Sequence, residues 1–279
     1  MKDLIRLYNI ESVHPKEAGI YTWIRVWLDE NEIDYKTDGI NIWRLTGKNI
    51  ILSAHMDQVE TNGQAEHFYK NREEISGYNK DYEQTSLGAD DKNGIWIILK
   101  ALEHNKDTDF IISAGEEVGC VGIDQMKKNG ILDVITDKSV CFVLDRRGFG
   151  EVLQRGSTGP YCNTLAQVLC NFFNQDCPEP IFEVSDGTLS DTSRLCERCE
   201  SVNISVAYYN PHTSKETTDF DELQFTKDKI IDALDNFVYY PCPVDTYFKP
   251  KGGYYERSSG YLDGYGQYSQ GSFDNYWGD

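Results

Sequence analysis

Hydrophobic residues recur along this chain in patterns typical of helices and of buried strands. Near the N-terminus, the segment 16–32 carries Ile20, Trp23, Ile24 and Trp27 at spacings of three, one and three, which predicts an amphipathic helix. Similar helical patterns occupy residues 92–105, 122–130, 161–175 and 226–240. Short apolar runs rich in Val, Ile or Phe predict strands at residues 40–45, 49–55, 110–113, 140–144 and 202–206.

The order of these elements predicts the fold class. Strands that alternate with helices along a chain form a sheet that is covered by helices on both faces. We therefore expect an α/β protein, a three-layer α/β/α sandwich with a central, mostly parallel (mixed) sheet. A chain of 279 residues is long enough to bury a full core, and we expect one domain over residues 1–245.

The composition changes near Pro243. Residues 251–279 hold seven Gly, six Tyr and four Ser, and Leu262 is their only aliphatic residue. Such a segment buries too little apolar area to offset the entropy lost on ordering. We expect a disordered tail over residues 246–279, whose tyrosines offer contacts to a protein partner.

The formal net charge of −19 narrows the range of partners. An acidic surface repels the phosphates of nucleic acids and the headgroups of anionic lipids, so neither class of partner is expected. The N-terminus lacks the apolar core of a secretion signal, and no run is long and apolar enough to cross a bilayer. These features indicate a cytoplasmic protein, in which the eight cysteines are reduced thiols.

Acidic residues and histidines follow several predicted strands. His55 and Asp57 lie two positions apart at the end of one apolar run, so that both side chains of an extended chain point to the same side. Ligands of open α/β sheets bind at the carboxyl ends of the strands, and these groups should therefore converge. The other candidates in such positions are Glu116, Glu117, Asp145 and His212.

A further pair of acids, Asp90 and Asp91, begins the helical pattern at residues 92–105. Taken singly, each of these residues has an ordinary explanation, such as a helix cap for Asp90 or an ion pair between Asp145 and Arg146 or Arg147. Taken together, two imidazoles and three carboxylates form a suitable set of ligands for two zinc-like ions.

Five motifs give these residues a family resemblance. The segments SAHMD, LGADDKNG, SAGEEVG, VLDRRG and NPHTSKE resemble, in the same order, those of the cocatalytic di-zinc exopeptidases and amidohydrolases. This clan includes peptidase T, carboxypeptidase G2 and related aminopeptidases. The resemblance covers residues 10–240 and supports the α/β/α expectation.

The resemblance also implies a role for each site residue. One metal ion would be held by His55, Asp90 and Asp145, and the other by Asp90, Glu117 and His212. Asp90 would bridge the two ions, because the family's bridging acid precedes the motif's lysine by two positions, here Lys92; Asp91 is the rival. Asp57 would orient the His55 ring, and Glu116 would be the general base that activates a metal-bridging water. The ions would be two Zn²⁺, with Co²⁺ or Mn²⁺ also suited to these ligands.

One feature departs from the peptidase T pattern. Many such relatives insert a dimerisation and lid domain between the counterparts of Asp145 and His212. Here this interval is 67 positions, and a helix, a turn region and a strand already fill it, so we expect no inserted domain. Asp191 lies in the interval, and the sequence leaves open whether it joins the site or caps a helix.

The leading functional hypothesis is a di-zinc metallopeptidase, an aminopeptidase or a di- or tripeptidase, with residues 1–245 as its catalytic domain. An acidic site without an obvious basic clamp suits a free substrate amine. Arg146 and Arg147 favour an alternative, because their guanidinium groups could bind a substrate carboxylate. The alternative function is a carboxypeptidase or an N-acyl-amino-acid amidohydrolase. A hypothesis of another class is a metal-binding scaffold without catalytic activity.

Overall fold

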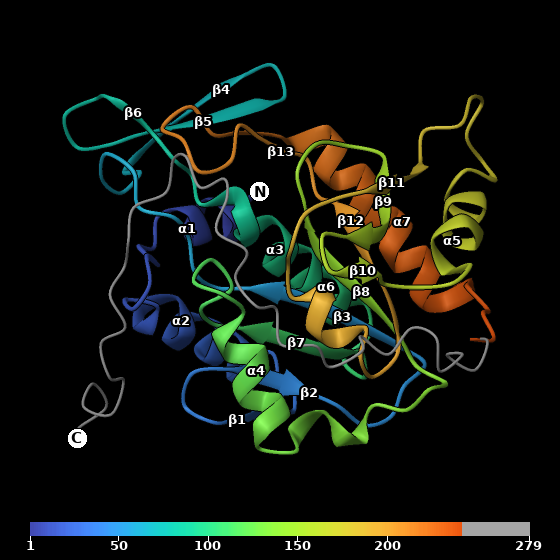
Figure 1. Cartoon of the computed structure of the whole chain (residues 1–279). Coiled ribbons are helices and arrows are strands. Elements are labelled where there is room, and N and C mark those ends of the chain that lie inside the picture. The colour runs from blue at the N-terminus through green and yellow to red at the C-terminus, as the bar shows by residue number, and fades with distance from the viewer. Residues whose placement is uncertain (242–279) are drawn as a thin grey trace, which may run out of the picture. The chain divides into compact units, whose positions relative to one another are not determined.

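The structure is a computed structural model that describes residues 1–241 (Figure 1). The predicted tail at residues 246–279 lies outside the described residues. Nine strands form the main sheet: β1 (Lys36–Thr37), β2 (Ile42–Arg44), β3 (Ile50–His55), β7 (Asp109–Ser113), β8 (Val140–Arg146), β9 (Glu151–Gly156), β10 (Gly159–Pro160), β11 (Glu183–Asp186) and β12 (Glu200–Ser205).

Four parallel strands form the centre of this sheet. The strand order is β1-β2-β7-β3-β8-β12-β9-β10, with β11 also paired to β9. The pairs β7–β3, β3–β8 and β8–β12 are parallel, whereas β2–β7 and β12–β9 are antiparallel. The carboxyl ends of β3, β7, β8 and β12 therefore lie at one edge of the sheet.

Helices cover both faces of the main sheet. Alternate residues of β8 separate the two faces: Phe142 and Leu144 belong to the larger hydrophobic core, and Cys141 and Val143 to the smaller one. The larger core includes residues of α1 (Lys2–Tyr8), α2 (Ala18–Glu30), α3 (Ala89–His104), α5 (Leu165–Phe173) and α7 (Phe220–Asn236). The smaller core includes residues of α4 (Val121–Lys128), the 3-10 helix η1 (Ile131–Val134) and α6 (Thr192–Leu195). The predicted three-layer α/β/α class is confirmed.

The apolar patterns located the main elements. All five predicted strands and all five predicted helices correspond to elements of the structure. The largest shift concerns the pattern at residues 226–240, since α7 begins at Phe220 and ends at Asn236. Its start is set by Asp219, whose side chain accepts hydrogen bonds from the amides of Asp221 and Glu222.

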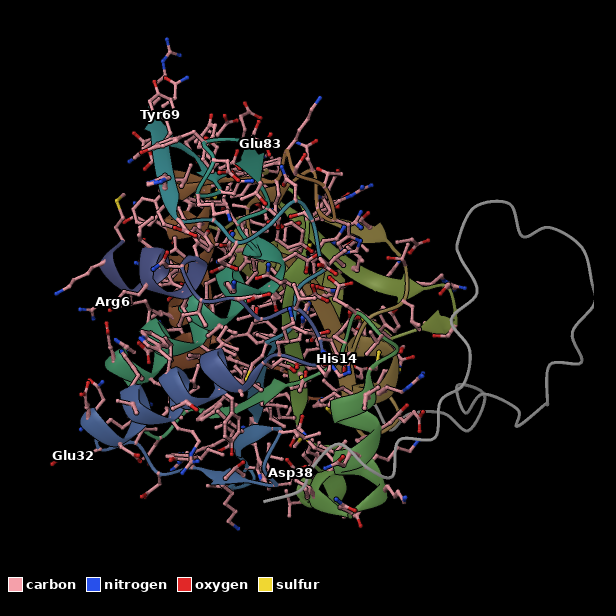
Figure 2. The ribbon with its side chains drawn as sticks, turned by 90° about the vertical axis from the view of Figure 1, so that its left-hand side faces the viewer. Arg6, His14, Glu32, Asp38, Tyr69 and Glu83 are labelled. Atoms are coloured by element: carbon pink, nitrogen blue, oxygen red, sulfur yellow. The ribbon has the colours of Figure 1, made fainter. Side chains whose placement is uncertain are left out.

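A second, smaller sheet does not follow from the apolar patterns. It comprises β4 (His67–Asn71), β5 (Glu74–Tyr78), β6 (Gln84–Thr85), β13 (Tyr208–Tyr209) and β14 (Thr217–Asp219), in the order β13-β14-β5-β4 with β6 beside β5. In Figure 2, Tyr69 and Glu83 of this region lie at the end of the molecule opposite Glu32 and Asp38. Its outer strand β4 is mostly exposed and polar. Its sequence therefore lacks the alternation of hydrophobic and polar residues that would predict a strand.

The segment between Asp145 and His212 mainly extends the main sheet. Strands β9, β10 and β11 lie at one edge of it, and α5 and α6 cover opposite faces. The sequence predicts one helix, a turn region and one strand there, whereas the structure adds β9, β10 and β11, none of which has more than two consecutive apolar residues. Among residues 1–241, no helix is both long enough and apolar enough to cross a bilayer.

Candidate metal centre

The predicted ligands lie together at the carboxyl edge of the four parallel strands. His55 is the last residue of β3, Asp145 is near the end of β8, and Glu117 lies in the loop after β7. Asp90 lies at the start of α3, and His212 lies in the loop between β13 and β14. Their side chains form two triads that share Asp90, and within each triad the candidate ligand atoms lie within 4.8 Å of one another.

The two oxygens of Asp90 face different imidazoles. In the first triad, His55 Nε2 lies 3.2 Å from Asp90 Oδ1 and 3.5 Å from Asp145 Oδ1. In the second, His212 Nε2 lies 3.2 Å from Asp90 Oδ2 and 2.9 Å from Glu117 Oε1. Each imidazole therefore has one acid of its own and shares the carboxylate of Asp90.

These separations fit a pair of bound cations. Nitrogen and oxygen ligands at 2.0–2.2 Å from a tetrahedral zinc ion lie roughly 3.3–3.6 Å from one another. The contacts of 2.9–3.5 Å between the ligand atoms are close to this range. In addition, the buried Glu117 Oε1 has no hydrogen bond among the described residues apart from its 2.9 Å contact with His212 Nε2. A donor set of imidazoles and carboxylates suits Zn²⁺, Co²⁺ or Mn²⁺.

Asp91 has a different environment from Asp90. Its buried carboxylate accepts hydrogen bonds from the main-chain amides of His55, at 3.2 Å, and Gly94, at 3.0 Å. The Asp90–Asp91 peptide bond is cis, and both residues have non-helical backbone angles within α3. Asp90 is thus the residue placed between the imidazoles, whereas Asp91 joins the backbones of β3 and α3.

Close packing brings the start of α3 next to Asp145. A Cβ atom at Gly94 would lie only 2.3 Å from the carbonyl oxygen of Leu144, the residue before Asp145. Only glycine permits this approach of helix and strand. The absence of a side chain at Gly94 therefore contributes directly to the distance between Asp90 and Asp145.

Asp57 contacts both the first imidazole and the loop after β7. Its Oδ1 lies 3.3 Å from His55 Nδ1. The same carboxylate accepts hydrogen bonds from the amides of Glu116, at 2.9 Å, and Glu117, at 3.0 Å. The contact with the ring suits the orientation of a metal-binding imidazole through its second nitrogen.

The electrostatics of the cluster show an excess of buried negative charge. Burial raises the pKa of Asp145 to about 7 and raises the pKa of Glu116 well above its usual value, with nearby acids adding to both shifts. Burial also disfavours the charged form of Asp90, but its contacts with His212 and His55 outweigh this and lower the pKa. Hydrogen bonds to Asp90 and Glu117 raise the pKa of His212 to about 10. Bound cations would supply the positive charge that protons otherwise provide.

Asp191, which the sequence left open, lies beside this cluster. It is 2% exposed, and its Oδ2 accepts a 2.5 Å hydrogen bond from Ser113, the last residue of β7. It occupies the N-cap position of α6, but its side chain makes no capping hydrogen bond. Burial raises the pKa of Asp191 to about 6. Its side chain therefore supports the start of the loop that carries Glu116.

The two arginines after Asp145 differ in their surroundings. Arg146 donates from Nε to Glu151 at 2.7 Å and is 16% exposed, so that its guanidinium already has a carboxylate partner. Arg147 is exposed. Neither forms an ion pair with Asp145, which was the ordinary alternative to metal binding; the carboxylate of Asp145 lies near His55 instead.

Two further residues hold Asp145 and were missed by the sequence analysis. Asn203 accepts from the amide of Asp145 at 3.2 Å and donates to its carbonyl oxygen at 3.1 Å. The hydroxyl of Tyr208 lies 3.4 Å from Asp145 Oδ1. A polar Asn within the apolar run 202–206 was a usable signal, but nothing local distinguishes Tyr208 from the tyrosine that follows it.

This chain resembles known proteins in its structure but not in its overall sequence. No protein-family profile matches the chain, and a search of curated proteins found no match. Solved structures do match. The aminopeptidase PepT of Bacillus cereus has a TM-score of 0.68 and 15% identity, covering 82% of this chain and 95% of that one. A tripeptidase of Staphylococcus aureus has a TM-score of 0.66 and 14% identity, covering 83% and 95%.

A third structure carries the metal in its name. The Zn-dependent exopeptidase of Parabacteroides distasonis has a TM-score of 0.62 and 14% identity, and the match covers 84% of this chain and 95% of that one. At such identities the similarity establishes the architecture. This chain therefore has the fold of the zinc-dependent exopeptidases, as its five motifs predict.

Proposed function

We propose that this chain is a metallo-exopeptidase that binds two divalent metal ions and hydrolyses a peptide bond near a free amino terminus. The proposed ions are Zn²⁺, with Co²⁺ or Mn²⁺ as alternatives. The observation that carries the proposal is the position of Asp90, which lies 3.2 Å from both imidazoles through its two separate oxygens. The structural similarity to an aminopeptidase, a tripeptidase and a Zn-dependent exopeptidase supports the same class of reaction.

The residues of the two triads would divide the work of metal binding. His55, Asp90 and Asp145 would hold one ion, and Asp90, Glu117 and His212 the other. When bound, two such ions polarise a carbonyl group and lower the pKa of water. Asp57 keeps His55 in place, and Asn203 keeps the backbone of Asp145 in place.

Glu116 is the proposed general base. Its main-chain amide is held by Asp57, and its partly buried side chain belongs to the same loop as Glu117. It would take a proton from the attacking water and later give that proton to the leaving amine, so that its own charge is restored at the end of the cycle. Burial favours the protonated form that this second step requires.

The surroundings of the site favour a substrate with a free amino group. Among residues 1–241, no Lys or Arg forms an ion pair with a proposed ligand, so the ligand cluster offers no basic clamp for a substrate carboxylate. Arg146, one of the two residues that favoured a carboxypeptidase or an N-acyl-amino-acid amidohydrolase, is paired with Glu151 instead. A small peptide with a free N-terminus is therefore the proposed substrate class.

A panel of dipeptides and tripeptides with free, acetylated or amidated ends tests this proposal, together with metal analysis of the purified protein. We expect two ions per chain and hydrolysis that requires a free amino terminus. The Glu116→Gln variant should retain the metal ions, and its kcat should be about 10²–10⁴-fold lower than that of the wild type. Cleavage of N-acetylated peptides alone would establish the amidohydrolase alternative. Two bound ions without hydrolysis of any peptide would establish the scaffold instead.

A further inference from the structure

Glu216 is a buried acid for which the proposed mechanism has no role. It lies in the loop between β13 and β14, four positions after His212, and is 1% exposed. Its Oε2 accepts hydrogen bonds from Ser86 Oγ at 2.6 Å and from the amide of Ala89 at 3.1 Å. Its Oε1 accepts from the amide of Asp90 at 3.2 Å.

These three donors all belong to the segment 86–90, which leads to the shared ligand Asp90. Glu216 itself belongs to the segment that carries His212. One carboxylate therefore joins the backbone of one proposed ligand to the loop of another, across 126 positions of the chain. The distance of 3.2 Å between His212 Nε2 and Asp90 Oδ2 depends on how these two segments are held together.

His212 is the more exposed of the two proposed imidazole ligands. Its side chain is 50% exposed, in contrast to that of His55, which is 2% exposed. The loop is anchored at its ends by two short strands, in which Tyr208 and Tyr209 pair with Thr218 and Thr217. Between these anchors, Glu216 is a buried side chain that reaches from this loop to the metal centre.

We propose that Glu216 is a positioning residue that sets the distance between His212 and Asp90 and thereby the affinity of the second metal ion. This inference rests on the proposed function, because it assumes that both residues bind metal. Three donors face Glu216, and a carboxylate, which only accepts, satisfies all of them. In Glu216→Gln, the side-chain NH₂ would oppose at least one of these donors and leave it unpaired in a buried position.

Zinc titration of the metal-free protein by calorimetry, with a competing chelator, tests the inference without relying on turnover. For Glu216→Gln we expect the weaker of the two dissociation constants to rise about 10–100-fold, the range typical when a group supporting a metal ligand is lost. The absorption spectrum of the Co²⁺ form should change as well, because the coordination of one ion is altered. A merely structural role would lower the melting temperature of the metal-free protein and leave both constants and the Co²⁺ spectrum unchanged.

Glu200→Gln is the matched control. Glu200 is 2% exposed and accepts from the amide of Asn163 at 3.0 Å and the hydroxyl of Tyr239 at 2.5 Å, but it begins β12, at the end of the sheet opposite the metal centre. Its replacement should affect stability and leave zinc affinity unchanged. Ser86→Ala removes a single hydrogen-bond donor to Glu216, and this variant tests the inference if Glu216→Gln does not fold. We expect the weaker of its two zinc dissociation constants to rise more than threefold.

The possible results distinguish a failure of this inference from a failure of the proposed function. If the wild-type protein binds fewer than two ions, the proposed function fails and the inference fails with it. If the wild type binds two ions and Glu216→Gln matches Glu200→Gln within threefold in both constants, the inference is wrong and the proposed function stands. The same threefold limit applies to Ser86→Ala.

Discussion

The carboxylate of Asp57 accepts a 2.9 Å hydrogen bond from the main-chain amide of Glu116. The same side chain lies 3.3 Å from His55 Nδ1 and also holds the amide of Glu117. One buried acid thus determines the orientation of a proposed metal ligand and the path of the loop that carries the proposed base. The two functions of the site, metal binding and proton transfer, share this support.

Replacement of Asp57 by Asn should therefore impair both functions. The Asn side chain has nearly the same size, but its NH₂ would face one of the two loop amides, and it has no charge to offer the imidazole. We expect zinc affinity to fall about 10–100-fold, with a further loss in kcat at saturating zinc. Zinc titration and steady-state kinetics measure the two effects separately.

Asp109→Asn is the comparison for Asp57→Asn. Asp109 is also fully buried and accepts from the amides of Thr46, Gly47 and Lys48, but it lies at the start of β7, away from the metal centre. The Asp109→Asn variant should be less stable than the wild type and should bind zinc with unchanged affinity. Equal losses of zinc affinity in both variants would show that Asp57 acts only through global stability.

Arg146 and Arg147 should differ in their contributions to stability. Arg146→Met leaves the partner Glu151 without its guanidinium, and we expect a loss of about 1–3 kcal/mol in the free energy of unfolding. Arg147→Met, at an exposed position, should change it by less than about 0.5 kcal/mol. Urea denaturation measures both. A larger loss in Arg147→Met than in Arg146→Met would contradict the pairing of Arg146 with Glu151.

Gly94→Ala should destabilise the protein and disturb the metal centre together. The new Cβ would lie 2.3 Å from the Leu144 carbonyl oxygen and must push α3 away from β8. Overpacking of this kind costs about 1–3 kcal/mol, and the displacement should also weaken zinc binding through Asp90. Thermal unfolding and zinc titration report the two effects.

Gly19→Ala in α2 is the control for Gly94→Ala, because both glycines are helical. A Cβ at Gly19 would meet the branch methyl Cγ2 of Ile10, at 3.3 Å, which needs a shift of only a few tenths of an ångström, and the carbonyl oxygen of Glu11, at 3.9 Å, which is an ordinary contact. Alanine also favours a helix over glycine by about 1 kcal/mol. Gly19→Ala should thus be neutral or stabilising, and a loss like that of Gly94→Ala would refute the packing argument.

Buried thiols should make the protein sensitive to alkali. Burial raises the pKa values of Cys162, Cys170 and Cys199 to about 12 in the folded state, from a starting value of 9.0. Above pH 9 the unfolded chain releases these protons while the folded chain keeps them, so the unfolded state gains free energy of ionisation. Their contribution to stability is complete below pH 9 and is lost progressively between about 9 and 12.

The midpoint of urea unfolding should accordingly fall between pH 8 and pH 10.5. Cys170→Ala and Cys199→Ala should each reduce this slope, although both also remove packing at every pH. Comparison of slopes rather than of absolute midpoints isolates the titration. A slope that is unchanged in both variants would exclude Cys170 and Cys199 as its source.

Much of this architecture follows from local information. The central strands are buried on both faces, so their sequences are continuous apolar runs, and the helices between them show one apolar face each. The second sheet escaped detection because β4 is exposed and polar, and because β5 pairs with β14, which lies far away in the chain. Pairing of this kind leaves no periodic signal within either segment.

The sequence by itself determined the alternation of strands and helices and the residue types at the strand ends, since these depend on local periodicity and on the rule that parallel strands end at one edge. Only the tertiary structure decided that the oxygens of Asp90 face both imidazoles while Asp91 turns to the backbone. Only the tertiary structure, likewise, shows the hydrogen bond between Glu216 and Ser86, 130 positions apart, and the pairing of Arg146 with Glu151. Such choices depend on backbone path and on hydrogen bonds between distant segments, which exist only once the chain is folded.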